Sequence, residues 1–286
     1  MHVPQTSLSA EELRFLDEAA LYLERPSFLL RVAEFVGQPA ERLLKLLPER
    51  AHAMVGQIAH SALERAFGLA VRSLSSRRWP IVGKWRPAAG PRLHVALTAI
   101  SGGAGGLFGW PGAAVEIPIT TTLMMRSIAE IARQNGSDLS DPETLMQCLA
   151  VFSYGAPKLE AMESAFLSWR VAMASAVSEA AAYIALHGAA GLTHSTAPAL
   201  VQFLSKIAAR FQIVISDKLA AEAVPVAGAV TGSLINAAFT DHFNRVAEFH
   251  FGILRLERLH GVEAVQAAYR RAADQAAGHR PNKALL

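Results

Sequence analysis

Six polar residues interrupt two long apolar stretches of the sequence and could carry chemistry. They are Glu116, Thr120, Arg126, Asn236, Thr240 and His250. A carboxylate in apolar surroundings must be paired, hydrogen-bonded or protonated, because an unpaired buried charge is strongly unfavourable. A carboxylate within reach of an imidazole is also a general acid–base pair. We therefore take these six residues as the candidate polar core site.

Helical spacing decides which of these side chains share a face. Thr120 follows Glu116 at i+4, and His250 follows Asn236 by fourteen residues, close to four whole turns. If the two segments pack together, Glu116, Asn236 and His250 could meet in the core. Such a meeting fits either a satisfied structural network or a ligand or catalytic site, for example the acid/base site of a hydrolase.

Searches for known catalytic and metal-binding motifs find little. The sequence contains no Gly-x-Ser-x-Gly elbow, no His-Glu-x-x-His motif and no phosphate-binding glycine loop. Glu49-x-x-His52 and Glu257-x-x-His260 have the spacing of ligands in di-iron bundles, but pairs like these are expected by chance. Cys148 is the only cysteine and is expected to be a small buried apolar residue. We predict no metal and no cofactor, and the sequence favours a protein that is not an enzyme.

Charge is concentrated in one part of the chain. The whole chain carries a formal charge of +3, with 27 basic and 24 acidic residues. Residues 65–115 contain seven bases and no acid, whereas residues 1–64 and 116–286 are each net acidic. A local field of this kind indicates an anionic partner, either phosphate-rich lipid or nucleic acid.

Tryptophans alternate with bases inside this acid-free segment. The predicted membrane-contact residues are Arg77, Arg78, Trp79, Lys84, Trp85, Arg86 and Trp110. Tryptophan prefers the headgroup region, and each base near an anionic surface contributes about 1 kcal/mol. Reversible docking on an anionic membrane surface is one interpretation, and an ordinary solvated loop is the other. No nucleic-acid-binding motif accompanies the patch, so no nucleic-acid partner is expected.

Glycines recur in two uncharged segments that flank the candidate core site. The predicted helix-packing glycines are Gly102, Gly105, Gly106, Gly109, Gly112, Gly228 and Gly232. Each glycine costs a helix about 1 kcal/mol relative to alanine, so the clusters require close packing or non-helical turns. We predict that 102–112 and 228–236 pack against each other or against one shared helix, which would bring Glu116 and Asn236 together at one end. A membrane-inserting hairpin and a close approach of a ligand are the alternatives.

Neither apolar stretch is a convincing membrane span. Residues 95–115 and 223–240 form uncharged runs of 21 and 18 residues, near the roughly 20 that a span requires. Glycine, proline and hydroxyl side chains interrupt both runs and weaken insertion. Shallow interfacial attachment or retraction into a helical bundle fits them better. The first residues also lack the basic and apolar regions of a signal peptide, so a cytoplasmic location is expected.

Helical periodicity dominates the rest of the chain and predicts an all-α fold. Ser9 and Glu12 form a capping box, Asn135-Gly136 ends a helix, and Asp141 with Pro142 begins another. Further helices are predicted over about 141–153, 159–188, 198–221, 225–259 and 262–277, with Gly261 as a C-cap. We predict one multi-helix, bundle-like domain over 1–286, with a core of about 8–277, a flexible tail at 278–286 and the two glycine-spaced helices closely packed at its centre.

Several blocks of sequence resemble the EcsC protein family. The longest is 102–122, and it is followed by 126–133, by Gly136 and Asp138, and by 141–143. Near the C-terminus the same resemblance covers 223–229, Asn236, 239–240, 250–251, 255–256 and Gly261. In all it extends from about Glu11 to Tyr269. The order and number of the blocks make the resemblance specific.

The resemblance implies a helical bacterial protein with a membrane-proximal accessory role, because the family is named for a protein encoded beside an ABC transporter. It carries no catalytic residue and no cofactor to this chain. We therefore expect an accessory protein at the inner face of the cytoplasmic membrane, with anionic lipid or the membrane surface as partner. An ABC transporter is a further expected partner, and lipid binding a further expected property. The alternative is a hydrolase with its acid/base site around Glu116 and His250.

Overall fold

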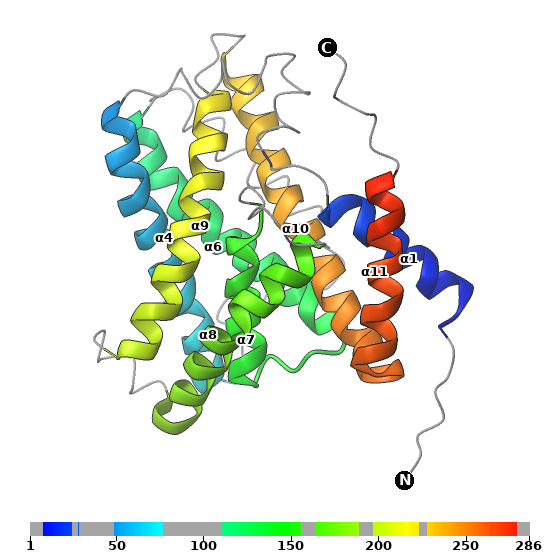
Figure 1. Cartoon of the computed structure of the whole chain (residues 1–286). Coiled ribbons are helices and arrows are strands. Elements are labelled where there is room, and N and C mark those ends of the chain that lie inside the picture. Colours follow the sequence, from blue (N-terminus) through cyan, green and yellow to red (C-terminus); the bar gives the residue numbers. More distant parts are fainter. Residues whose placement is uncertain are drawn as a thin grey trace.

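The fold consists of helices throughout the described part of the chain (Figure 1). The computed structural model describes residues 8–24, 28, 49–76, 110–155, 164–188, 197–222 and 228–278, and the side chains of 49–53, 71–76, 110–113 and 228–232 are not described. The helices are α1 (Ala10–Leu23), α4 (Glu49–Ser76), α6 (Trp110–Gln134), α7 (Pro142–Ala150), a 3₁₀ helix η1 (Val151–Ser153), α8 (Ala165–His187), α9 (Pro198–Glu222), α10 (Gly228–His260) and α11 (Val262–Gly278). No strand occurs among these residues, and the all-α prediction is confirmed.

Local sequence signals set the beginnings of two helices. At the start of α1, the Ser9 amide donates to the Glu12 carboxylate at 2.7 Å, and the Glu12 amide donates to Ser9 Oγ at 3.2 Å. This is the predicted capping box. At the start of α7, Asp141 accepts a hydrogen bond from the Glu143 amide at 3.1 Å, and Pro142 occupies the first helical position.

Two glycines end helices as their positions in the sequence predict. Gly136 follows α6 with φ +75°, and Gly261 separates α10 from α11 with φ +87°. Both values lie in the left-handed region, which glycine adopts without a steric penalty. The helix boundaries at 134 and 260 are therefore local properties of the sequence.

The predicted start of α8 is wrong by several residues. The periodicity places it near 159, whereas the helix begins at Ala165 and Ser164 has extended backbone. Ser164 caps the helix locally, since its Oγ accepts a hydrogen bond from the Leu167 amide at 3.2 Å, and a contact with a distant part of the chain adds to this cap. Glu24, at the end of α1, accepts hydrogen bonds from the amides of Ala165 at 2.7 Å and Phe166 at 3.3 Å, and from the Ser164 hydroxyl at 2.6 Å. A carboxylate at a helix N-terminus satisfies orphan amides and complements the helix dipole.

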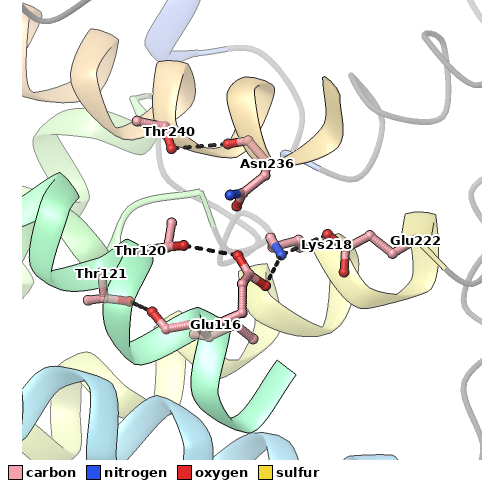
Figure 2. A network of polar contacts seen from close by, with 8 residues as sticks. Glu116, Thr120, Thr121, Lys218, Glu222, Asn236 and Thr240 are labelled. Carbon is pink, nitrogen blue, oxygen red and sulfur yellow. Dashed lines mark hydrogen bonds and ion pairs between the residues drawn. The ribbon is translucent and has the colours of Figure 1, made fainter. Parts of the chain in front are cut away.

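Helices α6 and α10 run side by side in the same direction. Near their first turns the side chain of Asn236 points from α10 toward Glu116 on α6 (Figure 2). Near their last turns Arg258 Nη2 donates to the Asn135 carbonyl at 2.6 Å. Helix α6 also packs on α4, and α9 packs on α4, α8 and α10. The core between α9 and α10 includes Phe211, Phe239 and Phe243, whose ring centroids are 5.2–6.2 Å apart.

Helix α1 lies across α10 and beside α11 (Figure 1). The crossing with α10 occurs at Gly252, where the ring of Phe15 lies directly over the glycine. A Cβ atom at position 252 would overlap that ring. The close approach of the two helices therefore depends on the absence of a side chain there.

Several predictions fall on parts of the chain that the structure does not describe. Residues 77–86 and 102–109 lie outside the described residues, as do 279–286 of the predicted tail. Trp110 and Gly112 belong to α6, and Gly228 and Gly232 belong to α10, through their backbones alone. The predicted packing of the two glycine segments, and the contact of the basic segment with a membrane, therefore stay predictions.

We expect Gly252→Ala to be less stable than the matched variant Gly68→Ala. Both changes replace a helical glycine and gain helix propensity, but a Cβ at Gly68 meets nothing within 4 Å. Overpacking against Phe15 should make Gly252→Ala the less stable of the two by about 1–3 kcal/mol. Urea denaturation measures this difference, and adding Phe15→Leu to Gly252→Ala should recover part of it. Equal stability of the two alanine variants would contradict the close crossing.

Candidate functional site

A buried cluster of three ionisable residues joins α6 to α9 (Figure 2). Lys218 Nζ on α9 lies 2.8 Å from Glu116 Oε2 on α6 and 2.7 Å from Glu222 Oε1 on its own helix. Thr120 Oγ1 donates to the other Glu116 oxygen at 2.9 Å. Lys218 is completely buried, and Glu116 is 6% exposed. These contacts satisfy both oxygens of Glu116 inside the protein.

Helical spacing produces this arrangement on each side of the interface. Glu116 and Thr120 are four residues apart on α6, and Lys218 and Glu222 are four residues apart on α9. The ammonium group of Lys218 also lies 5.8 Å from the ring centroid of Phe239 on α10, which is a cation–π distance. The lysine therefore contacts α6, α9 and α10 at one point.

The pKa shifts in the cluster follow from burial and from the neighbouring charges. Burial by itself lowers the pKa of Lys218, but the attraction of Glu222 and Glu116 outweighs it, so the pKa is raised. Burial also raises the pKa of Glu222, and Lys218 only partly offsets that effect. Lys218 is therefore held as a cation. A lysine held in this form is an ion-pair partner and not a nucleophile or base.

Asn236 and Thr240 border this cluster from α10. The side chain of Asn236 points toward Glu116 and Lys218 (Figure 2). Thr240 Oγ1 donates to the Asn236 carbonyl at 3.0 Å. Both residues are completely buried. Of the six candidate residues, the structure thus gathers Glu116, Thr120, Asn236 and Thr240 in one region.

His250 does not reach this region. Its Nε2 lies 3.0 Å from Gln147 Oε1 on α7, and its ring lies edge-on to Phe166 and Trp169 on α8. Fourteen residues of α10 return to the same helix face, but they also advance about 21 Å along the axis. Glu116 and His250 therefore do not form an acid–base pair. The prediction that they meet was wrong because a shared helix face does not place two residues at the same height along the helix axis.

The surroundings of His250 keep its imidazole neutral. Burial, and then the charge of Arg170, lower its pKa from 6.5 to about 3. Arg170 makes a bidentate ion pair with Glu257, with N–O distances of 2.7 and 2.8 Å. His250 Nδ1 is buried and accepts no hydrogen bond within the described residues.

Arg126 lies apart from both of these sites. It follows the cluster on α6, toward the C-terminal end of the helix, and its side chain is partly buried. Burial lowers its pKa. Its Nε atom is buried, and within the described parts of the chain it has no hydrogen-bond partner.

The Glu-x-x-His pairs provide no metal site among the described residues. Glu257 binds Arg170, whereas His260 Nε2 lies 2.8 Å from Glu12 Oε1 on α1. Cys148 is buried in the core, and burial raises the pKa of its thiol. These side chains therefore serve packing and pairing in the fold.

Sequence reasoning missed Lys218, the central residue of the cluster. A signal was present, because Lys218 and Glu222 are an oppositely charged i,i+4 pair within a long apolar helix. Asp217, also buried, stands beside them in the sequence. The burial of the Glu116 carboxylate by itself requires a nearby cation, and Lys218 supplies it.

The fold and the site together define a class: an all-helical protein whose core contains a buried ion cluster. The family model of the EcsC protein family matches residues 88–256, which is more than half of the chain. The chain belongs to this family, as the resemblance implies. No curated protein and no solved structure matches the chain.

We expect Lys218→Met to destabilise the protein strongly. Removing the cation leaves Glu116 and Glu222 without a counter-charge in the core, which typically costs about 3–5 kcal/mol. The matched control is Lys206→Met on the same helix, because Lys206 is exposed and, among the described residues, donates only to the Ala172 carbonyl. Urea denaturation measures both variants. The neutral triple variant Glu116→Gln/Lys218→Met/Glu222→Gln should recover much of the loss, and a loss below about 1 kcal/mol in the single variant would contradict the ion cluster.

We expect His250 to lower stability in acid. Between pH 6.5 and about 3 the unfolded state binds a proton that the folded state does not, so stability is lost as pH falls below 6.5. At pH 5 the loss relative to pH 8 is about 2 kcal/mol. His250→Phe should remove this part of the pH dependence, whereas His60→Gln at an exposed position should retain it. Parallel stability–pH curves for His250→Phe and the unmodified protein would contradict a buried neutral imidazole.

Proposed function

We propose that the protein is a helical accessory protein that attaches peripherally to the anionic inner face of the cytoplasmic membrane. The observation that carries the proposal is the segment 65–115, which contains seven bases and no acid. Four of these bases lie at 77–86 beside two tryptophans. Basic clusters with aromatic residues are attracted to anionic headgroups.

Exposed apolar side chains near this segment support the proposal. Val115 and Ile119, one turn apart on α6, are 61% and 47% exposed, and Leu234 on α10 is 47% exposed. All three lie in the first turns of helices that pack side by side. An amphipathic surface that combines bases with apolar side chains favours interfacial attachment.

The composition of α9 is compatible with peripheral attachment. Among the described residues, α9 (Pro198–Glu222) is long and apolar enough to cross a membrane, a test that core helices of soluble proteins also pass. It packs on α4, α8 and α10, and Lys218 on it is completely buried in an ion cluster. These contacts support its interpretation as the central helix of a bundle.

A hydrolase is not supported by the geometry, because Glu116 and His250 contact different groups in different regions. An ABC transporter as partner remains part of the proposal through the family resemblance. Such a partner would bring the protein to the same membrane face as the basic segment.

We expect the protein to sediment with vesicles of phosphatidylcholine and phosphatidylglycerol at low salt. Binding should fall as salt rises, because screening weakens attraction between exposed charges and headgroups. Replacing Arg77, Arg78, Lys84 and Arg86 by Glu should lower the partition coefficient at least about a hundredfold, since each base contributes about 1 kcal/mol. Vesicles of pure phosphatidylcholine should bind weakly.

The matched control reverses four exposed bases elsewhere: Arg14, Arg255, Arg270 and Arg271. It introduces the same change in net charge but leaves the acid-free segment intact, so vesicle binding should fall far less. Equal losses in both quadruple variants, or no binding by the unmodified protein at low salt, would overturn the proposal.

A further inference from the structure

Arg126 is a cation in a partly buried position, and none of the described residues is its acidic partner. Burial shifts its pKa downward, and no carboxylate in the described part of the chain offsets this effect. Its Nε atom is inaccessible to solvent and has no hydrogen-bond partner within the described segments. A desolvated guanidinium without a hydrogen-bond partner destabilises the folded state. No contact among the described residues compensates for this loss.

The nearest acid on the same helix face accepts hydrogen bonds from other residues. Glu130 lies one turn after Arg126, the spacing of a helical ion pair. Its two oxygens instead accept hydrogen bonds from Arg133 at 2.6 and 2.9 Å and from Gln134 at 2.9 Å. All three donors belong to residues 133 and 134, toward the C-terminal end of α6. The charge of Arg126 is thus left available to an external anion.

The same face of α6 continues as an apolar strip on the other side of Arg126. Val115, Ile119 and Arg126 are separated by four and seven residues, so they lie along one side of the helix. Val115 and Ile119 are exposed at 61% and 47%. Along the axis they are about 16 Å and about 10 Å from Arg126. One face therefore presents a cation at one end and apolar side chains at the other.

We propose that this face binds a single anionic phospholipid, with its phosphate at Arg126 and an acyl chain along Ile119 and Val115. The inference rests on the proposed membrane association and names the lipid class and the residue that recognises it. A guanidinium pairs with phosphate oxygens through two parallel N–H donors, and for Arg126 these are the two Nη groups, because its Nε is closed to solvent. The apolar strip selects an anion that carries a hydrocarbon chain over inorganic phosphate.

The experiment uses the full-length protein and dioctanoylphosphatidylglycerol below its critical micelle concentration, so that no membrane surface is present. Isothermal titration calorimetry should show saturable binding of this lipid and much weaker binding of dioctanoylphosphatidylcholine and inorganic phosphate. Arg126→Gln should weaken the binding of the anionic lipid about tenfold or more, because it removes a charge-assisted contact. Ile119→Ser should weaken it about threefold, because it removes apolar contact with the chain.

The matched control is Arg245→Gln on α10, which removes an exposed cation that is already paired with Asp241 and leaves the contacts of Glu130 unchanged. It should bind the lipid within about twofold of the unmodified protein. Arg126→Lys should bind with intermediate affinity, because an ammonium keeps the charge and loses the planar pair of donors. The melting temperature of Arg126→Gln should be equal to or higher than that of the unmodified protein, since an unpaired cation has been removed.

The inference is overturned if Arg126→Gln binds the short-chain lipid as the unmodified protein does, if inorganic phosphate binds as tightly as the lipid, or if no saturable binding occurs. The proposed membrane association is tested separately by vesicle sedimentation with the 77–86 variant. Vesicle binding that depends on these bases together with no effect of Arg126→Gln would overturn this inference alone. A protein that binds no vesicles at low salt would overturn the proposed function.

Discussion

The burial of Lys218 is the constraint on which the centre of this protein depends. A completely buried ammonium must have counter-charges, and Glu116 and Glu222 supply them from two helices at distances below 3 Å. Because Glu116 is on α6 and the Phe239 ring is on α10, the lysine contacts three helices at once. Neither α6 nor α9 can slide by one turn against the other without leaving Glu116 without its counter-charge in the core.

A second set of polar contacts joins the opposite ends of α6 and α10 and connects α1 to α8 and α11. Arg258 on α10 donates to the carbonyl of Asn135 after α6, and Glu24 joins the end of α1 to the start of α8 and to the hydroxyl of Tyr269 on α11. Hydrophobic packing is non-directional, whereas these hydrogen bonds require particular partners. The aromatic core supplies most of the burial, and the polar contacts select one arrangement of the helices.

This arrangement places a charged cluster inside the protein and leaves apolar side chains exposed elsewhere. Lys218 and Glu222 of α9 point inward to the cluster, and α9, whose composition most resembles a membrane span, packs on α4, α8 and α10. Val115 and Ile119 are exposed apolar side chains on α6. Peripheral attachment leaves the ion cluster intact, whereas insertion of α9 would place its charges in hydrocarbon.

The sequence by itself determined the helical class, the capping box at Ser9, the start of α7 at Asp141 and the helix ends at Gly136 and Gly261, because each depends on residues within one turn of each other. It also indicated that Glu116, Thr120, Asn236 and Thr240 are buried polar residues of the core. Only the tertiary structure decided that Lys218 is the partner of Glu116, that His250 lies four turns along α10 from the ion cluster, and that Glu24 binds the start of α8. These outcomes depend on which helices are neighbours and on their relative positions along their axes, and residues 102 and 141 positions apart in the chain carry no local signal of that register.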